Sequence, residues 1–392
     1  MRKQKTGQIA LAMAAALALA ACGHGQDTKE EGAAAEETGE IERSPEEPES
    51  PAEEEAETLD TQTESGEDTW KQRFGENCIP DQCFEVELSE YDGSVLFVPF
   101  APSEDTPEFH IQLFQGEEVL TELTGYVPEN LAGEPFQSLD AVSFFDVNYD
   151  GCTDILLIET YGDTCFAAVY YGFDDDAGVF WPQEQLSDQL TRQAEAMTVP
   201  AIRDLLSGGK KNGAFESCQE AYEAVSRLCE LESEEALTYD LIYVDEDEIP
   251  ELAAGKNGYY TSLYTCENGT VYTLMDRWPY GVMGNAGYEY APKKNSPRND
   301  NADYAGAILY TTYMEIGSSH TLDTVAEIKL VNFDDVNGNG VPDEEEMGSV
   351  GSYGVCYLDG EEASDEECAV FDAGGYEPIM GSMSREELLE KL

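Results

Sequence analysis

The stretch Phe144–Ile158, FFDVNYDGCTDILLI, decides what fold and what site we expect. Oxygen-bearing side chains alternate along its centre at Asp146, Asn148 and Asp150, and Gly151 follows where a tight loop needs positive φ. Apolar residues that favour β-structure flank the acidic segment on both sides. The pattern predicts a strand, a short acidic loop and a second strand.

This acidic segment, called loop one below, has the donor spacing of a Ca²⁺ site. Carboxylate, amide and carbonyl oxygens spaced in this way around a glycine suit a hard cation. The expected ligands are four side chains and one backbone carbonyl, namely Asp146, Asn148, Asp150, Asp154 and the carbonyl of Cys152. The twelfth position is Leu157, so the bidentate Glu of an EF-hand is missing. The alternative is a solvated acidic turn without metal.

Loop three, Asp335–Glu346, fits the pattern D-x-[DN]-x-[DN]-G-x₅-E at every position. The expected ligands are Asp335, Asn337, Asn339, the carbonyl of Val341, Asp343 and Glu346. Because two of these side chains are neutral amides, we expect weak binding, as in extracellular modules. A loop that binds no metal is the alternative here too.

Loop two, Tyr243–Glu251, is a degenerate copy of the same pattern. Tyr243 replaces the first acid and Glu248 replaces the glycine. Asp245, Asp247 and Glu251 remain as weak candidate ligands. The alternative is a plain hairpin turn.

The chain is strongly acidic. It has 392 residues with 83 Asp and Glu against 20 Lys and Arg, a formal net charge of −63. This charge repels nucleic acid, which is therefore excluded as a partner. Bound divalent cations would lower the self-repulsion, whereas the simpler interpretation is solubility outside the cell.

The N-terminus has the pattern of an export signal. Basic residues at Arg2, Lys3 and Lys5 precede the apolar stretch Ile9–Ala21, which is too short to span a membrane. The tetrapeptide Leu19–Cys22, Leu-Ala-Ala-Cys, resembles the lipobox of bacterial lipoproteins. The resemblance implies a diacylglyceryl group on Cys22 and anchoring on the extracytoplasmic face of the cell membrane. An ordinary secretory signal with a chance cysteine is the alternative.

Composition divides the chain into four parts. We expect a signal peptide at 1–21, an acidic disordered tether at 22–68, a β-rich domain at 69–206 and an α+β domain at 207–392. The tether lacks the apolar residues needed for a core, and the Gly-rich run Ser207–Gly213 marks the domain boundary.

Hydrophobic periodicity predicts a β-rich α+β fold with antiparallel sheets and one main helix, Phe215–Leu237. A short helix is expected at Gln183–Arg192 and an irregular region at Gly281–Asn301. Strands are expected at Cys83–Leu88, Ser94–Phe100, Phe109–Phe114, Glu118–Leu123, Ile155–Thr160, Cys165–Phe173, Tyr239–Val244, Glu251–Ala254, Tyr259–Cys266, Thr270–Met275, Ala307–Ile316 and Thr324–Phe333.

Two of the loops resemble those of known families. Loop one is similar to the Asp-x-Asn-x-Asp-Gly-x-x-Asp loops of FG-GAP and VCBS-type β-proteins, which implies a Ca²⁺ loop between two strands. Loop two and the region Phe215–Cys368 resemble an uncharacterised lipoprotein family of gut Firmicutes, over about half of the chain. A propeller carries several such blades, and with one good copy we do not expect a complete propeller.

The cysteines suit an exported protein that forms disulfides. Nine remain besides Cys22, and the pairs close in sequence are Cys78–Cys83, Cys152–Cys165 and Cys356–Cys368. Because nine is odd, at least one thiol is left over. No CxxC motif occurs, which disfavours a zinc ribbon or a thioredoxin-like site.

No catalytic motif stands out, so the sequence leans away from an enzyme. The leading hypothesis is a lipid-anchored, Ca²⁺-binding cell-surface module for adhesion, ligand capture or envelope organisation, with an unknown surface protein or glycan as partner. A carboxylate-dependent hydrolase acting on carbohydrate is the first alternative, and a solute-binding lipoprotein the second. Aromatic residues that suit sugar stacking are Trp278, Tyr280, Tyr288 and Tyr290.

Overall fold

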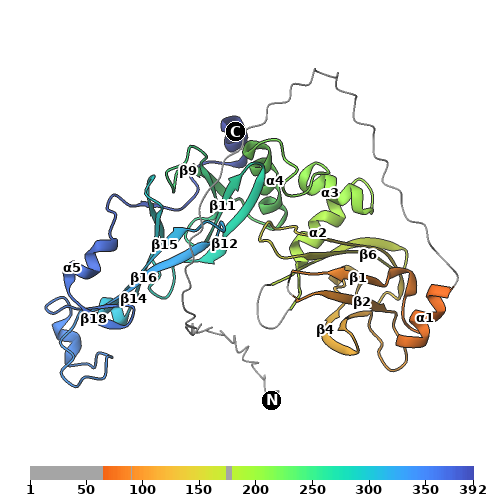
Figure 1. Ribbon diagram of the computed structural model, residues 1–392, viewed down its shortest axis with the longest axis horizontal. Helices are drawn as coiled ribbons and strands as arrows, with labels where there is room; N and C mark the ends of the chain where they lie inside the picture. Colours follow the sequence, from red (N-terminus) through yellow and green to blue (C-terminus); the bar gives the residue numbers. More distant parts are fainter. Residues whose placement is uncertain (1–64, 90, 174–178) are drawn as a thin grey trace, which may run out of the picture. The chain divides into compact units, whose positions relative to one another are not determined.

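The computed structural model describes residues 65–89, 91–173 and 179–392 (Figure 1). The expected signal peptide, Cys22 and the tether up to residue 64 lie outside these residues. The described part is β-rich with antiparallel sheets and few helices, which confirms the predicted fold class at that level. Within it, none of the helices combines the length and the apolar character needed to cross a bilayer.

Two four-stranded sheets form the first half. The first sheet has the order β1-β2-β3-β4, with β1 Phe84–Glu87, β2 Ser94–Phe100, β3 His110–Gln115 and β4 Glu118–Thr124. The second has the order β5-β6-β7-β8, with β5 Phe136–Phe145, β6 Asp154–Tyr161, β7 Thr164–Tyr171 and β8 Trp181–Pro182. Loop one therefore joins β5 to β6, as the sequence predicts.

Strand β6 is the central element of this half because both of its faces are covered. Successive side chains of a strand point to opposite faces. Ile155 and Leu157 accordingly pack in the core shared with the first sheet, whereas Leu156 packs in a core on the other side. The uninterrupted apolar run after Asp154 thus fits a strand that is buried on both faces.

Helices cover the outer face of the second sheet. They are α2 Glu184–Gln193, α3 Val199–Ser207 and α4 Cys218–Leu231. Helix α4 corresponds to the predicted Phe215–Leu237 helix but is shorter at both ends. Ser217 sets its start by accepting from the Glu220 N–H, and Glu232 caps its end. Helix α3 was not predicted, although the cap Thr198 and the left-handed Gly208 delimit it.

Two further sheets form the second half. The third has the order β12-β11-β10-β9, with β9 Thr238–Ile242, β10 Glu251–Lys256, β11 Tyr260–Glu267 and β12 Thr270–Pro279. The fourth, in the order β18-β17-β16-β15-β14-β13-β19, comprises β13 Gly287–Ala291, β14 Ser296–Asp303, β15 Ile308–Ile316, β16 Leu322–Val331, β17 Val355–Leu358, β18 Glu361–Ala363 and β19 Glu377–Pro378. The region 281–301, expected to be irregular, thus contains β13 and most of β14.

Short helices and turns complete the described chain. The α-helices are α1 Ser65–Phe74, α5 Asp365–Cys368 and α6 Arg385–Lys391, and the 3₁₀ turns are η1 Pro80–Gln82, η2 Glu129–Leu131, η3 Tyr304–Gly306, η4 Glu346–Ser349 and η5 Ala369–Phe371. Helix α1 begins before residue 69, where we expected order to start.

One hydrophobic core crosses the expected domain boundary. It combines Leu156 and Tyr171 of the second sheet with Tyr222 of α4 and Tyr264 of β11, all of them buried. The division at residues 206 and 207 therefore lies between elements that share a core, and it stays a prediction.

A late segment of the chain closes the edge of the third sheet. The N–H of Tyr239 on β9 donates to the Met383 carbonyl at 2.8 Å, and the N–H of Met383 donates back at 3.0 Å. Met383 and Leu388 are buried in the shared core. At Gly381 an added Cβ would lie 2.1 Å from the Thr238 backbone, so this close approach requires glycine.

Two disulfides are formed among the described cysteines. Cys356–Cys368 confirms one predicted pair, and Cys218–Cys266 joins the start of α4 to β11. The predicted Cys152–Cys165 pair is wrong: Cys165 is a free thiol on β7, and its Sγ lies 3.7 Å from Asp140. The predicted Cys78–Cys83 pair is not bonded either: both are free thiols, with their Sγ atoms 3.4 Å apart.

Candidate metal centres

Loop one turns tightly enough to direct its polar side chains inward. Tyr149 and Gly151 have φ values of 63° and 87°, in the left-handed region. Asn148 Oδ1 accepts from the Asp150 N–H at 3.3 Å, and Asp150 Oδ1 accepts from the Cys152 N–H at 2.8 Å. These short-range hydrogen bonds orient the side-chain oxygens of Asn148 and Asp150 before any ion binds.

Asp154 anchors the base of loop one. It is fully buried, and its Oδ2 accepts from the Val147 N–H at 2.6 Å while its Oδ1 accepts from the Gly172 N–H at 2.9 Å. Burial raises the pKa of Asp154 well above its usual range. Each oxygen retains a second lone pair, so this anchoring role is compatible with metal ligation.

Asp146 carries the feature that points most directly to a ligand. Its Oδ2 accepts from the Gly151 N–H at 3.3 Å, whereas its Oδ1 is buried without a hydrogen-bond partner among the described residues. Burial, and then the charge of Asp150, raise the pKa of Asp146 to about 7. A buried carboxylate oxygen without a partner is costly, and a divalent cation would supply the missing partner.

The expected ligands of loop one lie close together in the sequence, although among the described residues the three acids whose oxygens all lie within 4.8 Å of one another are those of loop two. Asp146, Asn148, Asp150 and Asp154 all lie in the same short turn, and Cys152 lies between the last two with its backbone in the loop. Burial also raises the pKa of Asp150. Carboxylates whose ionisation is opposed in this way are stabilised in their charged form by a bound cation.

Loop two repeats three hydrogen bonds of loop one at the corresponding positions. Asp245 Oδ1 accepts from the Asp247 N–H at 2.9 Å, and Asp247 Oδ1 accepts from the Ile249 N–H at 2.7 Å. Glu251 is fully buried and accepts from the Val244 N–H at 2.8 Å, as Asp154 does from Val147. Both loops therefore share these hydrogen bonds where they lead into the next strand, although the positive φ values of Tyr149 and Gly151 have no counterpart at Glu246 and Glu248.

Three carboxylates of loop two converge. One oxygen from each of Asp245, Asp247 and Glu251 lies within 4.8 Å of the others. Burial raises the pKa of Glu251 to about 8. The sequence ranked this loop lowest because Tyr243 and Glu248 break the motif. The sequence names Glu251 but does not reveal its burial, and its longer side chain accepts from the Val244 N–H as Asp154 accepts from the Val147 N–H.

Loop three is closed by its first and last acids. Asp335 Oδ1 accepts from the Gly338 and Asn339 N–H groups at 2.8 and 3.2 Å, and Asp335 Oδ2 accepts from the Gly340 N–H at 2.9 Å. Glu346, the buried last acid, accepts from the Asn337 N–H at 3.3 Å. The chain thus folds around the expected ligands in the order that the motif predicts.

The middle of loop three contains the remaining donors. Asn339 Oδ1 accepts from the Val341 N–H at 2.8 Å, and Asp343 N–H donates to Glu346 Oε2 at 3.1 Å. A cavity of about 240 Å³ lies beside them, lined in part by Asn337, Asp343 and Glu346. Because the side chains of Asn339 and Val341 are exposed, this loop is more open to solvent than loop one.

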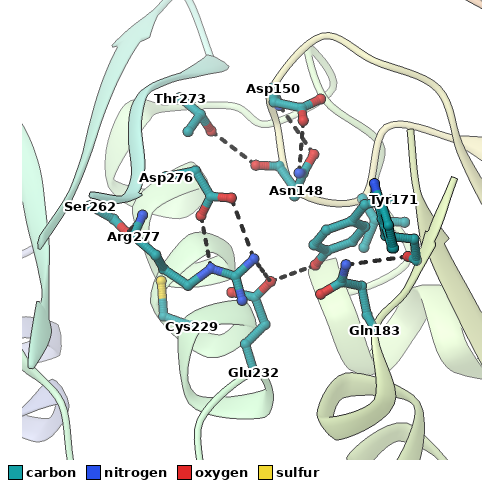
Figure 2. Close-up of polar contacts among 12 residues, drawn as sticks. Asn148, Asp150, Tyr171, Gln183, Cys229, Glu232, Ser262, Thr273, Asp276 and Arg277 are labelled. Carbon is teal, nitrogen blue, oxygen red and sulfur yellow. Dashed lines mark hydrogen bonds and ion pairs between the residues drawn. The ribbon is translucent and has the colours of Figure 1, made fainter. Parts of the chain in front are cut away.

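Loop one is held against the third sheet (Figure 2). The hydroxyl of Thr273, on β12, donates to the Asn148 carbonyl at 2.9 Å, and the Thr273 N–H donates to the Tyr149 carbonyl at 3.0 Å. The Tyr149 ring is buried and lies 6.4 Å from the Phe215 ring. A strand from another sheet therefore fixes the backbone of the loop.

The ion pairs of Arg277 lie next to the contact between Thr273 and Asn148 (Figure 2). The Arg277 guanidinium contacts Asp276 at 3.1 and 3.3 Å and Glu232 at 3.9 Å. The charge of Asp276 contributes, after burial and several opposing hydrogen bonds, to the raised pKa of Asp150. The charge of Asp276 on β12 therefore contributes to the negative potential at loop one.

Comparisons with protein-family models, with curated proteins and with solved structures found no match.

Proposed function

We propose that this protein is a Ca²⁺-binding module anchored by lipid to the extracytoplasmic face of a bacterial cell membrane. Its surface would serve adhesion, ligand capture or envelope organisation. The anchor is inferred from the basic N-terminus and from Cys22 in the sequence Leu-Ala-Ala-Cys. The bound ion is inferred from loop one.

The observation that carries the ion is the buried Oδ1 of Asp146, which has no hydrogen-bond partner among the described residues. Asp150 and Asp154 add two more carboxylates in the same turn. Without a cation these charges oppose one another and burial opposes all three. A bound Ca²⁺ would offset both effects and complete the oxygen shell.

The ion would have a structural role that supports surface display. Loop one contacts β12 through Thr273, so an ion in this loop would strengthen the junction between the second and third sheets. Loop two would act in the same way between β9 and β10. We propose that these two four-stranded sheets are two blade-like units of the FG-GAP or VCBS kind, without a complete propeller.

Titration calorimetry with CaCl₂ on the chain from residue 23 tests the ion. We expect Asp146→Asn, which keeps the shape and removes one charge, to lower the number of bound ions by one. Asp335→Asn should abolish a separate and weaker site in loop three. Asp163→Asn is the matched control, because Asp163 is an exposed carboxylate in the β6–β7 turn. Absence of Ca²⁺ binding by the unsubstituted chain, or unchanged binding by Asp146→Asn, would overturn the proposal.

Metabolic labelling with an alkyne fatty acid tests the anchor. The intact chain, expressed in a bacterium, should carry the label and sediment with membranes. Cys22→Ser should lose both properties. Labelling that persists in Cys22→Ser, or an unlabelled intact chain, would contradict lipid anchoring.

The partner can be sought once Ca²⁺ binding is measured. A glycan array and a pull-down from envelope extracts, each with and without a chelator, would separate a glycan from a protein partner. We expect retention to require Ca²⁺ and to be lost in Asp146→Asn. Retention that is equal with and without chelator would argue against a Ca²⁺-dependent surface module.

A further inference from the structure

Cys78 and Cys83 lie at a tight turn between α1 and β1. Their Sγ atoms are 3.4 Å apart, and the 3₁₀ turn η1, Pro80–Gln82, brings them together. Cys78 is fixed by a β-bridge to Phe100, and Cys83 immediately precedes β1. Backbone structure on both sides therefore holds the two sulfur atoms side by side.

We propose that Cys78 and Cys83 form a dithiol–disulfide couple, a third disulfide that closes this turn. A covalent bond requires the sulfur atoms to approach from 3.4 Å to about 2.05 Å. A movement of little more than an ångström within one turn is sufficient. The proposal does not depend on metal binding.

The reaction uses an external disulfide as oxidant, either a low-molecular-weight disulfide or a thiol–disulfide exchange protein. The hydrogen bond from Cys83 lowers the pKa of Cys78, so the Cys78 thiolate attacks the external disulfide, and one thiolate leaves. Cys83 then loses its proton, attacks the Sγ of Cys78 at 3.4 Å and expels the second thiolate. In total, two protein thiols lose two electrons and two protons, and the external disulfide becomes two thiols.

The local environment suits Cys78 as the attacking thiolate, whereas the hydrogen bond to Cys78, and then burial, raise the pKa of Cys83. A hydrogen bond from Cys83, and more weakly the charge of Lys71, lower the pKa of Cys78 despite its burial. The Cys83 sulfur also lies 3.3 Å from the Ile79 carbonyl, which keeps it over the turn. The reacting atoms are thus oriented toward each other before oxidation.

Other described thiols have different surroundings. Cys165 lies beside Asp140, and burial followed by that carboxylate raises its pKa. Cys229 is buried with its Sγ 3.5 Å from the Tyr264 hydroxyl, and burial raises its pKa to about 12. Neither thiol is placed for rapid disulfide exchange, so the reaction should be specific to the turn.

The disulfide would stabilise the edge of the first sheet. Cys78 and Cys83 pack with Trp70 and Phe74 of α1 and with Phe114 of β3. A bond between them ties the start of β1 to the segment that bridges β2. The oxidised form should therefore hold edge strand β1 in place more firmly than the dithiol.

Peptide mass spectrometry provides a direct test. The purified chain from residue 23 is equilibrated with oxidised glutathione or with a reductant, alkylated, and digested with a Glu-specific protease. Cleavage after Glu76 and Glu85 releases Asn77–Glu85, NCIPDQCFE, which contains both cysteines. We expect the oxidised sample to give this peptide without alkylation and two hydrogens lighter than the unmodified dithiol, and the reduced sample to give the doubly alkylated form.

Two variants make the outcome decisive. In Cys83→Ser, Cys78 should become alkylated or joined to glutathione, whereas Cys165→Ser should leave the oxidised peptide unchanged. Double alkylation of Asn77–Glu85 after glutathione oxidation would overturn the proposal. A cross-link from Cys83 to a peptide other than its own would overturn it as well.

Discussion

The phenol of Tyr171 donates a hydrogen bond of 2.6 Å to Glu232 Oε1, which joins β7 to the end of α4. The next residue, Gly172, donates its N–H to Asp154 at the base of loop one. Glu232 in turn pairs with Arg277 on β12. Loop one is thus linked to the third sheet both through Thr273 and through this buried polar group.

Removing the Tyr171 hydroxyl should weaken this link. In Tyr171→Phe, the buried Glu232 loses a donor, and we expect the free energy of unfolding to fall by about 1–3 kcal/mol. Urea denaturation measures the change. Tyr304→Phe is the matched control because Tyr304 is half-exposed, with an exposed fraction of 50%. Equal stability of the two variants would show that the Glu232 group contributes nothing to the junction.

Removing the Thr273 hydroxyl should affect loop one more directly. Thr273→Val keeps the shape and the backbone hydrogen bond to Tyr149 but leaves the Asn148 carbonyl without its side-chain donor. We expect stability to fall by about 1 kcal/mol and Ca²⁺ to bind more weakly in calorimetry. Thr324→Val, at an exposed position of β16, should change neither quantity. Unchanged Ca²⁺ affinity in Thr273→Val would show that the contact with the third sheet does not support Ca²⁺ binding by loop one.

Loop two should hold an ion of its own. Asp247→Asn removes one of three converging carboxylates, so we expect one fewer ion per chain, measured by Ca²⁺ competition against terbium luminescence. Glu246→Gln, an adjacent exposed position, is the charge-matched control. If both variants bind as many ions as the original chain, the three carboxylates stabilise the turn and do not bind Ca²⁺.

Glu159 should make stability depend on pH. It is fully buried on β6, and both carboxylate oxygens are without a hydrogen-bond partner among the described residues. Burial, and then the charge of Asp140, raise its pKa to about 8. A raised folded-state pKa means that the folded protein binds the extra proton, so stability is lost as pH rises through about 8.

The corresponding measurement is denaturation between acidic and mildly alkaline pH. In the original chain, Glu159 should make the free energy of unfolding fall by up to about 1.4 kcal/mol for each pH unit between 4.5, the ordinary pKa of a glutamate, and about 8. Glu159→Gln should flatten this dependence and be the more stable protein at pH 9. Glu117→Gln, in the exposed β3–β4 turn, is the control. An unchanged slope in Glu159→Gln would mean that Glu159 does not titrate in the folded state.

The Cys218–Cys266 disulfide should contribute more than Cys356–Cys368. The first closes a separation of 48 residues and the second one of 12. Chain entropy then predicts losses of about 4 and about 3 kcal/mol when each pair is replaced by serines. Denaturation of the two double variants tests the order. A larger loss for the Cys356→Ser/Cys368→Ser protein would indicate that loop length does not govern these contributions.

Local patterns in the sequence predicted what depends on local structure. Loop one, the strand after it and helix α4 follow from the spacing of a few neighbouring residues. The Cys218–Cys266 bond and the Thr273 contact to Asn148 could not be predicted, because they join segments brought together only by packing.

Loop two shows that a sequence motif can also fail to indicate local structure. Its motif is broken at Tyr243 and Glu248, yet three hydrogen bonds of loop one recur, among them the one that buried Glu251 accepts from the Val244 N–H. A motif compares the identity of each position, whereas these hydrogen bonds require only a side-chain acceptor at three of them.

The bridge between Tyr239 and Met383 has a consequence for biosynthesis. Strand β9 is made well before the segment that covers its edge, so a growing chain would expose that edge until residue 383 has emerged. Premature stop products, or chains clipped after β18, would keep it open and be prone to intermolecular strand pairing. Quality-control proteases could therefore distinguish full-length molecules from fragments by this one uncovered strand.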